Sequence, residues 1–383
     1  MAATGFQRSC YSFVLLASLL VATSMAEASP NRTVVEEVTG WLRIYSDGTV
    51  ERLTPPGAEP FTAIIPPYST PRGGITVHDI TTGRGVDVRL YLPVPAATSN
   101  SPHHRRRRRR PVLVHLHGGG FCVSRPSWAL YHNFYAPLAA DLGVAGIVSV
   151  YLPLAPERRL PAAIDAGHAA LLWLRDVASG RNLYSTGDSA VVERFRHAAD
   201  FSQVFLVGDS SGGNLVHLVA ARVGAGEDAP GARPRALHPV RLAGGVLLHP
   251  GFAREKKSRS EIENPPSMFL TPEMIDKLLA LGLPVGVNKD SRYTSPEMAA
   301  MAVANVRMPP LLLMVAEKDL LRDPQLDYGK AMRHVGKEVE TVVSRGDVAH
   351  IFYLNFFAVE SEQLTKNRTK ELVHTIKRFI DRH

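Results

Sequence analysis

The amino-acid sequence predicts an α/β fold, with a mostly parallel central sheet flanked by helices and residues 29–383 forming a single domain. Short apolar runs rich in Val, Leu and Ile alternate with helical patterns along the 383 residues. This alternation is typical of parallel sheets that helices cover on both faces. Two of the apolar runs end in glycine-rich turns, at residues 117–120 and 208–212. A chain of this length in this class often folds as one unit.

The strands begin with a predicted hairpin. Trp41–Tyr45 and Val50–Leu53 flank Asp47-Gly48, which is a favourable turn dipeptide. The sheet is expected to continue through Val86–Leu92, Val112–Leu116, Ala145–Tyr151, Val204–Val207, Leu242–Leu248, Leu311–Ala316 and Val339–Val343. Helical periodicity is found at Pro161–Ala178, Asn214–Val223 and Leu364–Ile380.

The segment between Pro250 and Leu311 departs from this alternation and is rich in proline. One helix is predicted in it, Pro272–Leu281, with Thr271 as N-cap and Pro272 at the first helical position. A long insertion beside the carboxyl edge of a sheet is usually functional. Three apolar side chains are candidates for the wall of a substrate pocket: Phe121, Phe269 and Leu270. For the last two, packing of the insertion onto the sheet is the alternative.

Ser210 is the candidate nucleophile. It lies in Gly208-Asp209-Ser210-Ser211-Gly212, after a predicted strand and before a predicted helix. Strand, Gly-x-Ser-x-Gly and helix form the context that a nucleophile elbow requires, because the turn is too sharp for a Cβ at either glycine. The turn His117-Gly118-Gly119-Gly120 also follows a strand. Its amides and that of Ser211 are expected to form an oxyanion hole, and which of the glycines donate is left open.

The partners of Ser210 should follow it as an acid and then a histidine. Asp319 lies just beyond the strand Leu311–Ala316, where open α/β sheets place site residues. Its rivals are Asp323, expected to cap the next helix, and Glu317, expected to be solvated. His350 is the one histidine between the last strand and the C-terminal helix. His350 would take the proton of Ser210 while Asp319 orients the imidazole.

These motifs together resemble the plant carboxylesterase branch of the hormone-sensitive-lipase-like α/β-hydrolases. The resemblance rests on residues 117–122, 154–163, 208–214, 319–323 and 350–353. It implies the triad Ser210, Asp319 and His350, and an oxyanion loop at His117–Gly120. It also implies a cap built from the N-terminal segment and an insertion near 251–300. The expected substrate is therefore a small-molecule ester with a small or medium acyl group.

Two other functions occur in the same family. Gibberellin receptors keep the fold and the serine but lack the catalytic histidine, so His350 argues against a hormone-binding protein without turnover. Other relatives dehydrate hydroxyisoflavanones or convert acylated sugars to lactones with much the same site residues, and a lyase therefore stays open. No Cys/His cluster has metal-ligand spacing and no phosphate-binding loop is present. No cofactor is expected.

The N-terminus predicts a secretory signal peptide over residues 1–28. Arg8 precedes the apolar run Phe13–Ala22, and Ala26-Glu27-Ala28 fits a cleavage site. The run is too short to span a bilayer. The alternative is an N-terminal helix of a cytoplasmic protein. Asn31 and Asn367 begin glycosylation sequons, which matter only if the chain is secreted.

The net charge of +8 comes mostly from one place. Arg105–Arg110 supply six of the positive charges and lie, with two histidines, in a loop at residues 103–110 between two predicted strands. Such a run repels itself and stays solvated, so nucleic acid is not an expected partner. Removal of the signal would leave Cys122 without a partner for a disulfide, and a buried structural thiol is expected there.

Overall fold

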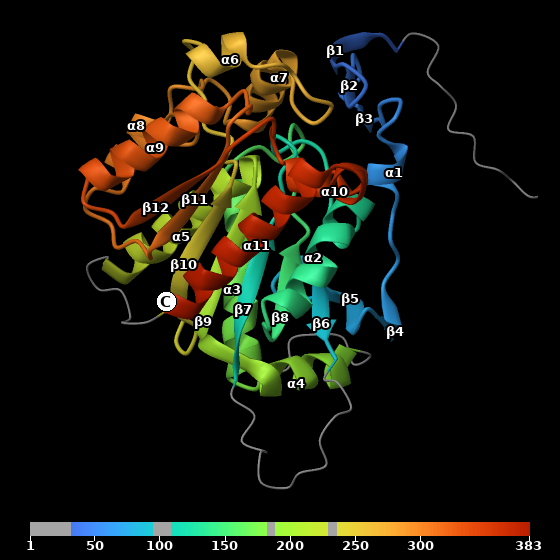
Figure 1. Ribbon diagram of the computed structural model, residues 1–383, viewed down its shortest axis with the longest axis vertical. Coiled ribbons are helices and arrows are strands. Elements are labelled where there is room, and N and C mark those ends of the chain that lie inside the picture. The colour runs from blue at the N-terminus through green and yellow to red at the C-terminus, as the bar shows by residue number, and fades with distance from the viewer. Residues whose placement is uncertain (1–31, 95–108, 182–187, 229–235) are drawn as a thin grey trace, which may run out of the picture.

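A nine-stranded sheet forms the centre of the computed structural model, which describes residues 32–94, 109–181, 188–228 and 236–383 (Figure 1). Within these ranges the strand order is β12-β11-β10-β9-β7-β8-β6-β5-β4. The six parallel strands are β7 (Arg110–Leu116), β8 (Gly146–Val150), β9 (Ala199–Asp209), β10 (Leu242–Leu248), β11 (Leu311–Ala316) and β12 (Val339–Ser344). The predicted mostly parallel sheet is thus confirmed.

One edge of this sheet is antiparallel. It consists of β4 (Tyr68–Arg72), β5 (Ile75–Thr81) and β6 (Asp87–Pro93). Of these strands, only β6 was predicted from the sequence. β5 carries Thr76, His78 and Asp79 between its apolar residues, and β4 is almost entirely exposed. Neither strand therefore shows the continuous apolar run that marks a strand buried on both faces.

The side chains of the sheet alternate between two core layers, as the period of two along a strand requires. On β7, Val112 and Val114 belong to a layer formed with α3 (Ala162–Ala178), α5 (Ser211–Asp228) and α9 (Arg322–His334). The intervening Leu113 belongs to a second layer, formed with α2 (Ala129–Asp141) and α11 (Gln363–Arg382). The predicted helices correspond to parts of α3, α5 and α11. Smaller helices are α1 (Glu59–Thr62), α4 (Ser189–Ala198), α10 (Phe356–Ser361) and η3 (Phe352–Leu354).

The predicted hairpin exists, but it does not continue the central sheet. Its strands β2 (Leu42–Tyr45) and β3 (Val50–Arg52) join β1 (Val34–Val38) in a separate antiparallel sheet. These strands are short and mostly half-buried, so they cannot fill a place that is covered on both faces. The small sheet instead packs on the insertion, where Lys277 Nζ donates to the Glu37 carbonyl oxygen at 2.6 Å.

The insertion holds three helices rather than the single one predicted. They are α6 (Arg259–Glu263), α7 (Pro272–Gly282) and α8 (Pro296–Ala302). The prediction for α7 is confirmed, because Thr271 caps it by accepting a hydrogen bond from Met274 N at 3.2 Å. α6 begins with a capping box in which Ser258 and Glu261 bond each other's backbone amides, a signal that the sequence analysis did not use. Helices α6 and α7 lie with β1–β3 at the top of the molecule (Figure 1).

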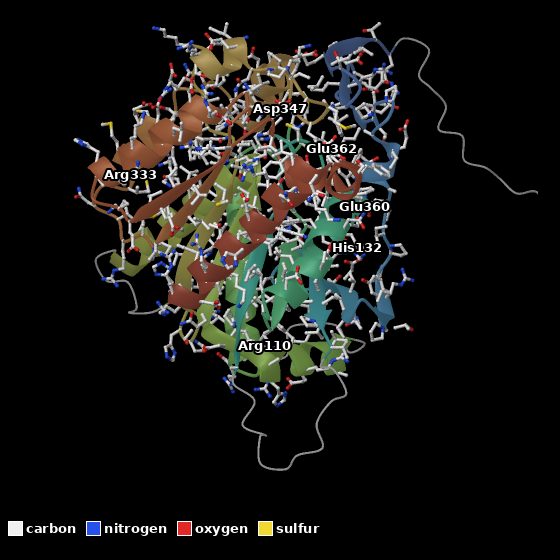
Figure 2. The ribbon with its side chains drawn as sticks, in the orientation of Figure 1. Arg110, His132, Arg333, Asp347, Glu360 and Glu362 are labelled. Atoms are coloured by element: carbon white, nitrogen blue, oxygen red, sulfur yellow. The ribbon has the colours of Figure 1, made fainter. Side chains whose placement is uncertain are left out.

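The other sequence predictions fall at the ends and edges of the fold. Residues 1–28, Asn31 and most of the loop 103–110 lie outside the described residues, whereas Asn367 is exposed on α11. Arg110 begins β7 at the bottom of the molecule, and Asp347, which precedes the candidate histidine, lies toward the top (Figure 2).

Cys122 is buried as expected, and burial raises the pKa of its thiol to about 12. Among the described helices, none is both long and apolar enough to cross a membrane.

One buried cation secures the antiparallel edge. Arg89 on β6 is 1% exposed, and its guanidinium donates to both carboxylate oxygens of Asp79 at 2.7 Å. It also donates to the Ile65 carbonyl oxygen at 2.8 Å. The Asp79 carboxylate is about one third exposed, so water can solvate it if the guanidinium is lost. Removal of Arg89 is therefore destabilising mainly because the buried stem of the arginine and the Ile65 carbonyl oxygen lose their contacts.

We expect Arg89→Ala to lower the free energy of unfolding by about 2 kcal/mol. Urea unfolding followed by circular dichroism measures this change. Arg72→Ala is the matched control, since Arg72 is exposed on the neighbouring strand β4, and it should stay within about 0.5 kcal/mol of the wild type. Equal losses in the two variants would contradict the role assigned to the buried guanidinium.

Candidate active site

Ser210 occupies the sharp turn between β9 and α5. Its φ is +50°, a left-handed conformation that few residues other than glycine adopt. A Cβ on Gly208 would lie 2.3 Å from the carbonyl oxygen of Gly212, and a Cβ on Gly212 would lie 2.0 Å from that of Leu116. Both glycines are therefore required by close backbone approach. The Ser210 amide donates to the Leu248 carbonyl oxygen at 3.0 Å, which fixes the turn against β10.

The glycine turn after β7 faces the same space. Gly119 and Gly120 have φ of +96° and +59°, and both line a cavity together with Ser210 and Ser211. Among the described residues, the amides of Gly119, Gly120 and Ser211 have no hydrogen-bond acceptor. These three amides are available to a ligand in the cavity.

Gly118 was also expected among the oxyanion donors, and the structure contradicts this. Its amide donates to Tyr131 Oη at 3.1 Å and to Asp209 Oδ2 at 3.2 Å. A Cβ at Gly118 would lie 2.5 Å from Asp209 Oδ2. The residue therefore anchors the turn instead of facing the cavity, because its N–H is already engaged in the interior.

Asp209 is the buried carboxylate that holds this anchor. Its Oδ2 accepts from the Tyr131 hydroxyl at 3.1 Å, and its Oδ1 accepts from His115 Nε2 at 3.2 Å. Burial lowers the pKa of His115, so the imidazole stays neutral and donates from one nitrogen. Asp209 thus joins the serine turn to the glycine turn. In the sequence, this aspartate is recognisable only as part of the Gly-x-Ser-x-Gly motif.

Asp319 and His350 form a buried pair. His350 Nδ1 donates to Asp319 Oδ2 at 2.8 Å. Asp319 also accepts from the Leu321 amide and from Gln325 Nε2, both at 2.9 Å. Burial alone would raise the pKa of Asp319. The electrostatic attraction of His350 and the hydrogen bond that His350 donates outweigh burial and hold the pKa of Asp319 below its ordinary value. The other ring nitrogen, His350 Nε2, is buried and has no partner among the described residues.

The rival carboxylates have other partners. Asp323 was expected to cap the following helix, but α9 begins at Arg322, so Asp323 lies inside its first turn. It accepts instead from the Ser260 amide at 2.9 Å. Glu317, expected to be solvated, accepts from the Gly346 amide at 2.6 Å. Of the three acids, Asp319 is the one that contacts His350.

His249 is a member of the site that sequence reasoning did not identify. It directly follows β10 with φ of +46°, is fully buried, and accepts a hydrogen bond at Nδ1 from the Ile351 amide at 2.8 Å. Its ring centre lies 6.1 Å from that of His350. His249, Asp319 and His350 offer three metal-ligand atoms within 4.8 Å of one another, but hydrogen bonds already engage Nδ1 of both histidines and both oxygens of Asp319. The position of His249 at the carboxyl end of a parallel strand was the signal that could have found it.

The cavity beside Ser210 has a volume of about 70 Å³ and a mostly apolar wall. Phe269 and Leu270 line it, as expected for pocket residues. Phe269 also packs edge-to-face on Phe61 with ring centres 5.2 Å apart, so it serves the cap as well. The expectation for Phe121 is wrong. Its side chain does not line the cavity and packs on Gly282, where an added Cβ would lie 2.8 Å from the ring.

Known proteins resemble this chain in sequence and in fold. Residues 113–354 match the family model described as alpha/beta hydrolase fold. The chain is 31% identical to probable carboxylesterase 6 of Arabidopsis thaliana, over 94% of this chain and 96% of that protein. It is 29% identical to 2-hydroxyisoflavanone dehydratase of Glycyrrhiza echinata, over 93% and 99%. The carboxylesterase EstE1 from a metagenomic library has the same fold, with a TM-score of 0.60 and 21% identity over 84% of this chain and 92% of that one.

Burial of His249 predicts a pH dependence of stability. Burial lowers the pKa of His249 to about 3, whereas an unfolded histidine titrates near 6.5. The unfolded state therefore binds more protons below about pH 6.5, so the stability is present above that pH and is lost as the pH falls toward 3. At pH 5 the loss from this residue should be about 2 kcal/mol.

The comparison of urea unfolding at pH 7 and pH 5 measures this effect. His249→Asn should lose about 2 kcal/mol less than the wild type between the two pH values. His197→Asn is the control, because His197 is exposed on α4, and it should lose as much as the wild type. An identical pH dependence in His249→Asn and the wild type would contradict the assignment.

Proposed function

The chain belongs to the plant carboxylesterase branch of the hormone-sensitive-lipase-like α/β-hydrolase family, and from this premise we propose that it is a serine carboxylesterase acting on small or medium acyl esters. The observation that carries the proposal is the arrangement around one cavity. Ser210 lines it beside three amides that have no acceptor within the described part of the chain. Ile351, which directly follows the His350 that bonds Asp319, lines it too.

Each group has a role in the proposed reaction. A serine hydroxyl is a poor nucleophile at its ordinary pKa, so His350 Nε2 takes its proton as Ser210 Oγ bonds to the ester carbonyl carbon. The same proton passes to the departing alcohol, which leaves an acyl-enzyme. Water then attacks the acyl carbon, His350 again transfers a proton, and the acid is released. Asp319 keeps the proton on Nδ1 of His350 and stabilises the imidazolium.

The three amides would stabilise the tetrahedral intermediates. As Ser210 attacks, the carbonyl oxygen gains negative charge, and the N–H groups of Gly119, Gly120 and Ser211 can donate to it. Each is fixed before substrate arrives, because the backbone on both sides is anchored by Asp209 and by the close contacts of the glycines. Loss of one such donor typically costs about 2.7–4 kcal/mol of barrier.

Two rivals are weaker on specific grounds. A receptor without turnover needs a pocket but has no use for an acid that orients a histidine, and here Asp319 does so at 2.8 Å. A lyase is suggested by the likeness to the dehydratase, and its products differ from those of a hydrolase. Release of one acid and one alcohol per ester consumed identifies hydrolysis.

Secretion is a separate part of the proposal, which rests on the sequence of residues 1–28. N-terminal sequencing of the protein expressed in its own type of cell tests it. A mature chain that begins near residue 29 supports a cleaved signal, and an active cytosolic protein that retains Met1 would overturn it.

Ser210→Ala should reduce kcat/KM for p-nitrophenyl acetate and butyrate by at least about a thousandfold, because it removes the nucleophile. Asp319→Asn should also reduce it strongly, since the imidazole loses the carboxylate that selects its tautomer. Release of p-nitrophenol measures both. Ser202→Ala is the control, because Ser202 is exposed on the same strand β9, and it should keep wild-type activity.

Two results would contradict the proposal. Equal turnover in Ser210→Ala and the wild type would remove Ser210 from the chemistry. A folded wild type that hydrolyses neither ester would favour a binding protein, to be followed by ligand screens.

A further inference from the structure

Ile351 has an unusual backbone conformation for its side chain. Its φ is +47°, in the left-handed region that glycine adopts freely and that is a genuine outlier for a β-branched residue. The residue is 8% exposed. A strained residue persists only where its surroundings hold it, and such residues gather at functional sites. A functional role of the isoleucine side chain would account for this strained conformation.

The surroundings of Ile351 hold the strained turn from both sides. On the backbone side, its amide donates to His249 Nδ1 at 2.8 Å, and its carbonyl oxygen accepts from the Leu354 amide at 2.9 Å. On the side-chain side, Ile351 belongs to the same buried apolar layer as Phe352 and Tyr353. The residue cannot relax by rotating its backbone without breaking the bond to His249.

Ile351 also lines the cavity that contains Ser210. The cavity is about 70 Å³, and since one water needs about 10–15 Å³ on this measure, it has room for about five water-sized groups. Ile351 follows His350 directly, whereas Leu278, Leu279 and Ile275 line the cavity from α7 in the cap. The available space is therefore bounded by aliphatic side chains from the body of the fold and from the cap.

The chemistry of the wall defines what fits. Among the described residues that line the cavity, Asp209 is the one charged side chain, and its oxygens already accept from Tyr131, Gly118 and His115. Trp41 and Trp128 supply aromatic surface, with ring centres 6.3 Å apart. An apolar wall without a free charge favours an uncharged aliphatic group.

We propose that Ile351 sets the upper limit on the aliphatic chain of the ester, so that the site takes short, uncharged esters. This inference rests on the proposed esterase function. The side chain is retained in a strained conformation because it fills the space beside Ser210 that a longer chain would need. The acyl chain and the alcohol chain share this chemistry, and separate substrate series distinguish them.

Kinetics with two substrate series provide the first test. The p-nitrophenyl esters from acetate to octanoate vary the acyl chain, and the acetates from methyl to hexyl vary the alcohol. In Ile351→Ala, the ratio of kcat/KM for the longest to the shortest member should rise at least about tenfold in one of the series, because a single methylene in a fitted pocket is worth that much. Ile351→Val should give a smaller rise in the same series.

The matched control is Ile380→Ala. Ile380 is buried in the same apolar layer but lies on α11 and does not line this cavity. Its chain-length ratios should stay within about twofold of the wild type. Ile351→Gly adds a variant that suits the left-handed backbone, so the test survives if Ile351→Ala does not fold. Circular dichroism confirms the fold of each variant.

A binding measurement separates this inference from the proposed function. In the Ser210→Ala background, Trp41 and Trp128 line the cavity, so their fluorescence reports ester binding without turnover. Ile351→Ala in that background should tighten the binding of the longest ester, relative to the shortest, in at least one of the two series. If no Ser210-dependent hydrolysis occurs in the wild type, the proposed function fails and this binding preference still tests Ile351.

The change in chain-length preference decides whether Ile351 limits the length of the ester. A gain for longer chains in either series supports the proposal and shows whether Ile351 faces the acyl or the alcohol group. Unchanged ratios in both series and unchanged relative binding, in folded Ile351→Ala or Ile351→Gly, would overturn it. A gain of the same size in Ile380→Ala would also overturn it, because the effect would then come from general loosening of the core.

Discussion

The close backbone contact between the serine turn and the end of β7 is the constraint on which the site depends. Gly212 approaches the Leu116 carbonyl oxygen so closely that a Cβ would lie 2.0 Å from it. This contact brings the first turn of α5 beside the residues that follow β7, and the amides of Gly119, Gly120 and Ser211 therefore face one cavity. Asp209 adds a polar link by accepting from Gly118 at 3.2 Å. Sterics set the distance between the two turns, and the buried carboxylate sets their orientation.

Several other residues at the site have strained backbone conformations. In the described part of the chain, the non-glycine residues with left-handed backbones are Phe121, Ser124, Ser210, His249 and Ile351. All follow the carboxyl ends of parallel strands, namely β7, β9, β10 and β12, and these ends lie on the same side of the sheet. Each such residue costs of order 1–3 kcal/mol, which the packed core must offset. Strained backbone conformations are therefore concentrated at the carboxyl ends of the parallel strands, where the site lies. This is expected where the geometry of a site is fixed before a ligand binds.

The sequence predicted the parts of this protein that depend on local patterns. The parallel strands and the N-cap Thr271 were recognisable because each depends on a few neighbouring residues. The hairpin was recognised from Asp47-Gly48, but its place in a separate sheet depends on packing against α7. The pairing of Asp319 with His350 was expected from chain order and from the position of Asp319 just beyond a predicted strand.

The errors share a physical cause, which is that long-range packing decides where a side chain or an amide points. Phe121 lies next to the glycine turn in sequence, yet its ring packs on Gly282. Gly118 belongs to the same turn as Gly119, yet its amide faces Tyr131 and Asp209. His249 becomes part of the site only because the loop after β12 reaches the end of β10, where the Ile351 amide donates to the imidazole. No local pattern contains these contacts.

The position of the arginine run bears on how the charge of the protein relates to its chemistry. Arg110 is the first residue of β7, and Leu116, the last, precedes the oxyanion turn. Six steps along a strand separate these residues by about 20 Å, so Arg109 and Arg110, the described members of the run, lie at the end of the sheet opposite to Ser210. Exposed charges this far apart are largely screened at physiological ionic strength. The charge of these two arginines and the apolar cavity should therefore act independently.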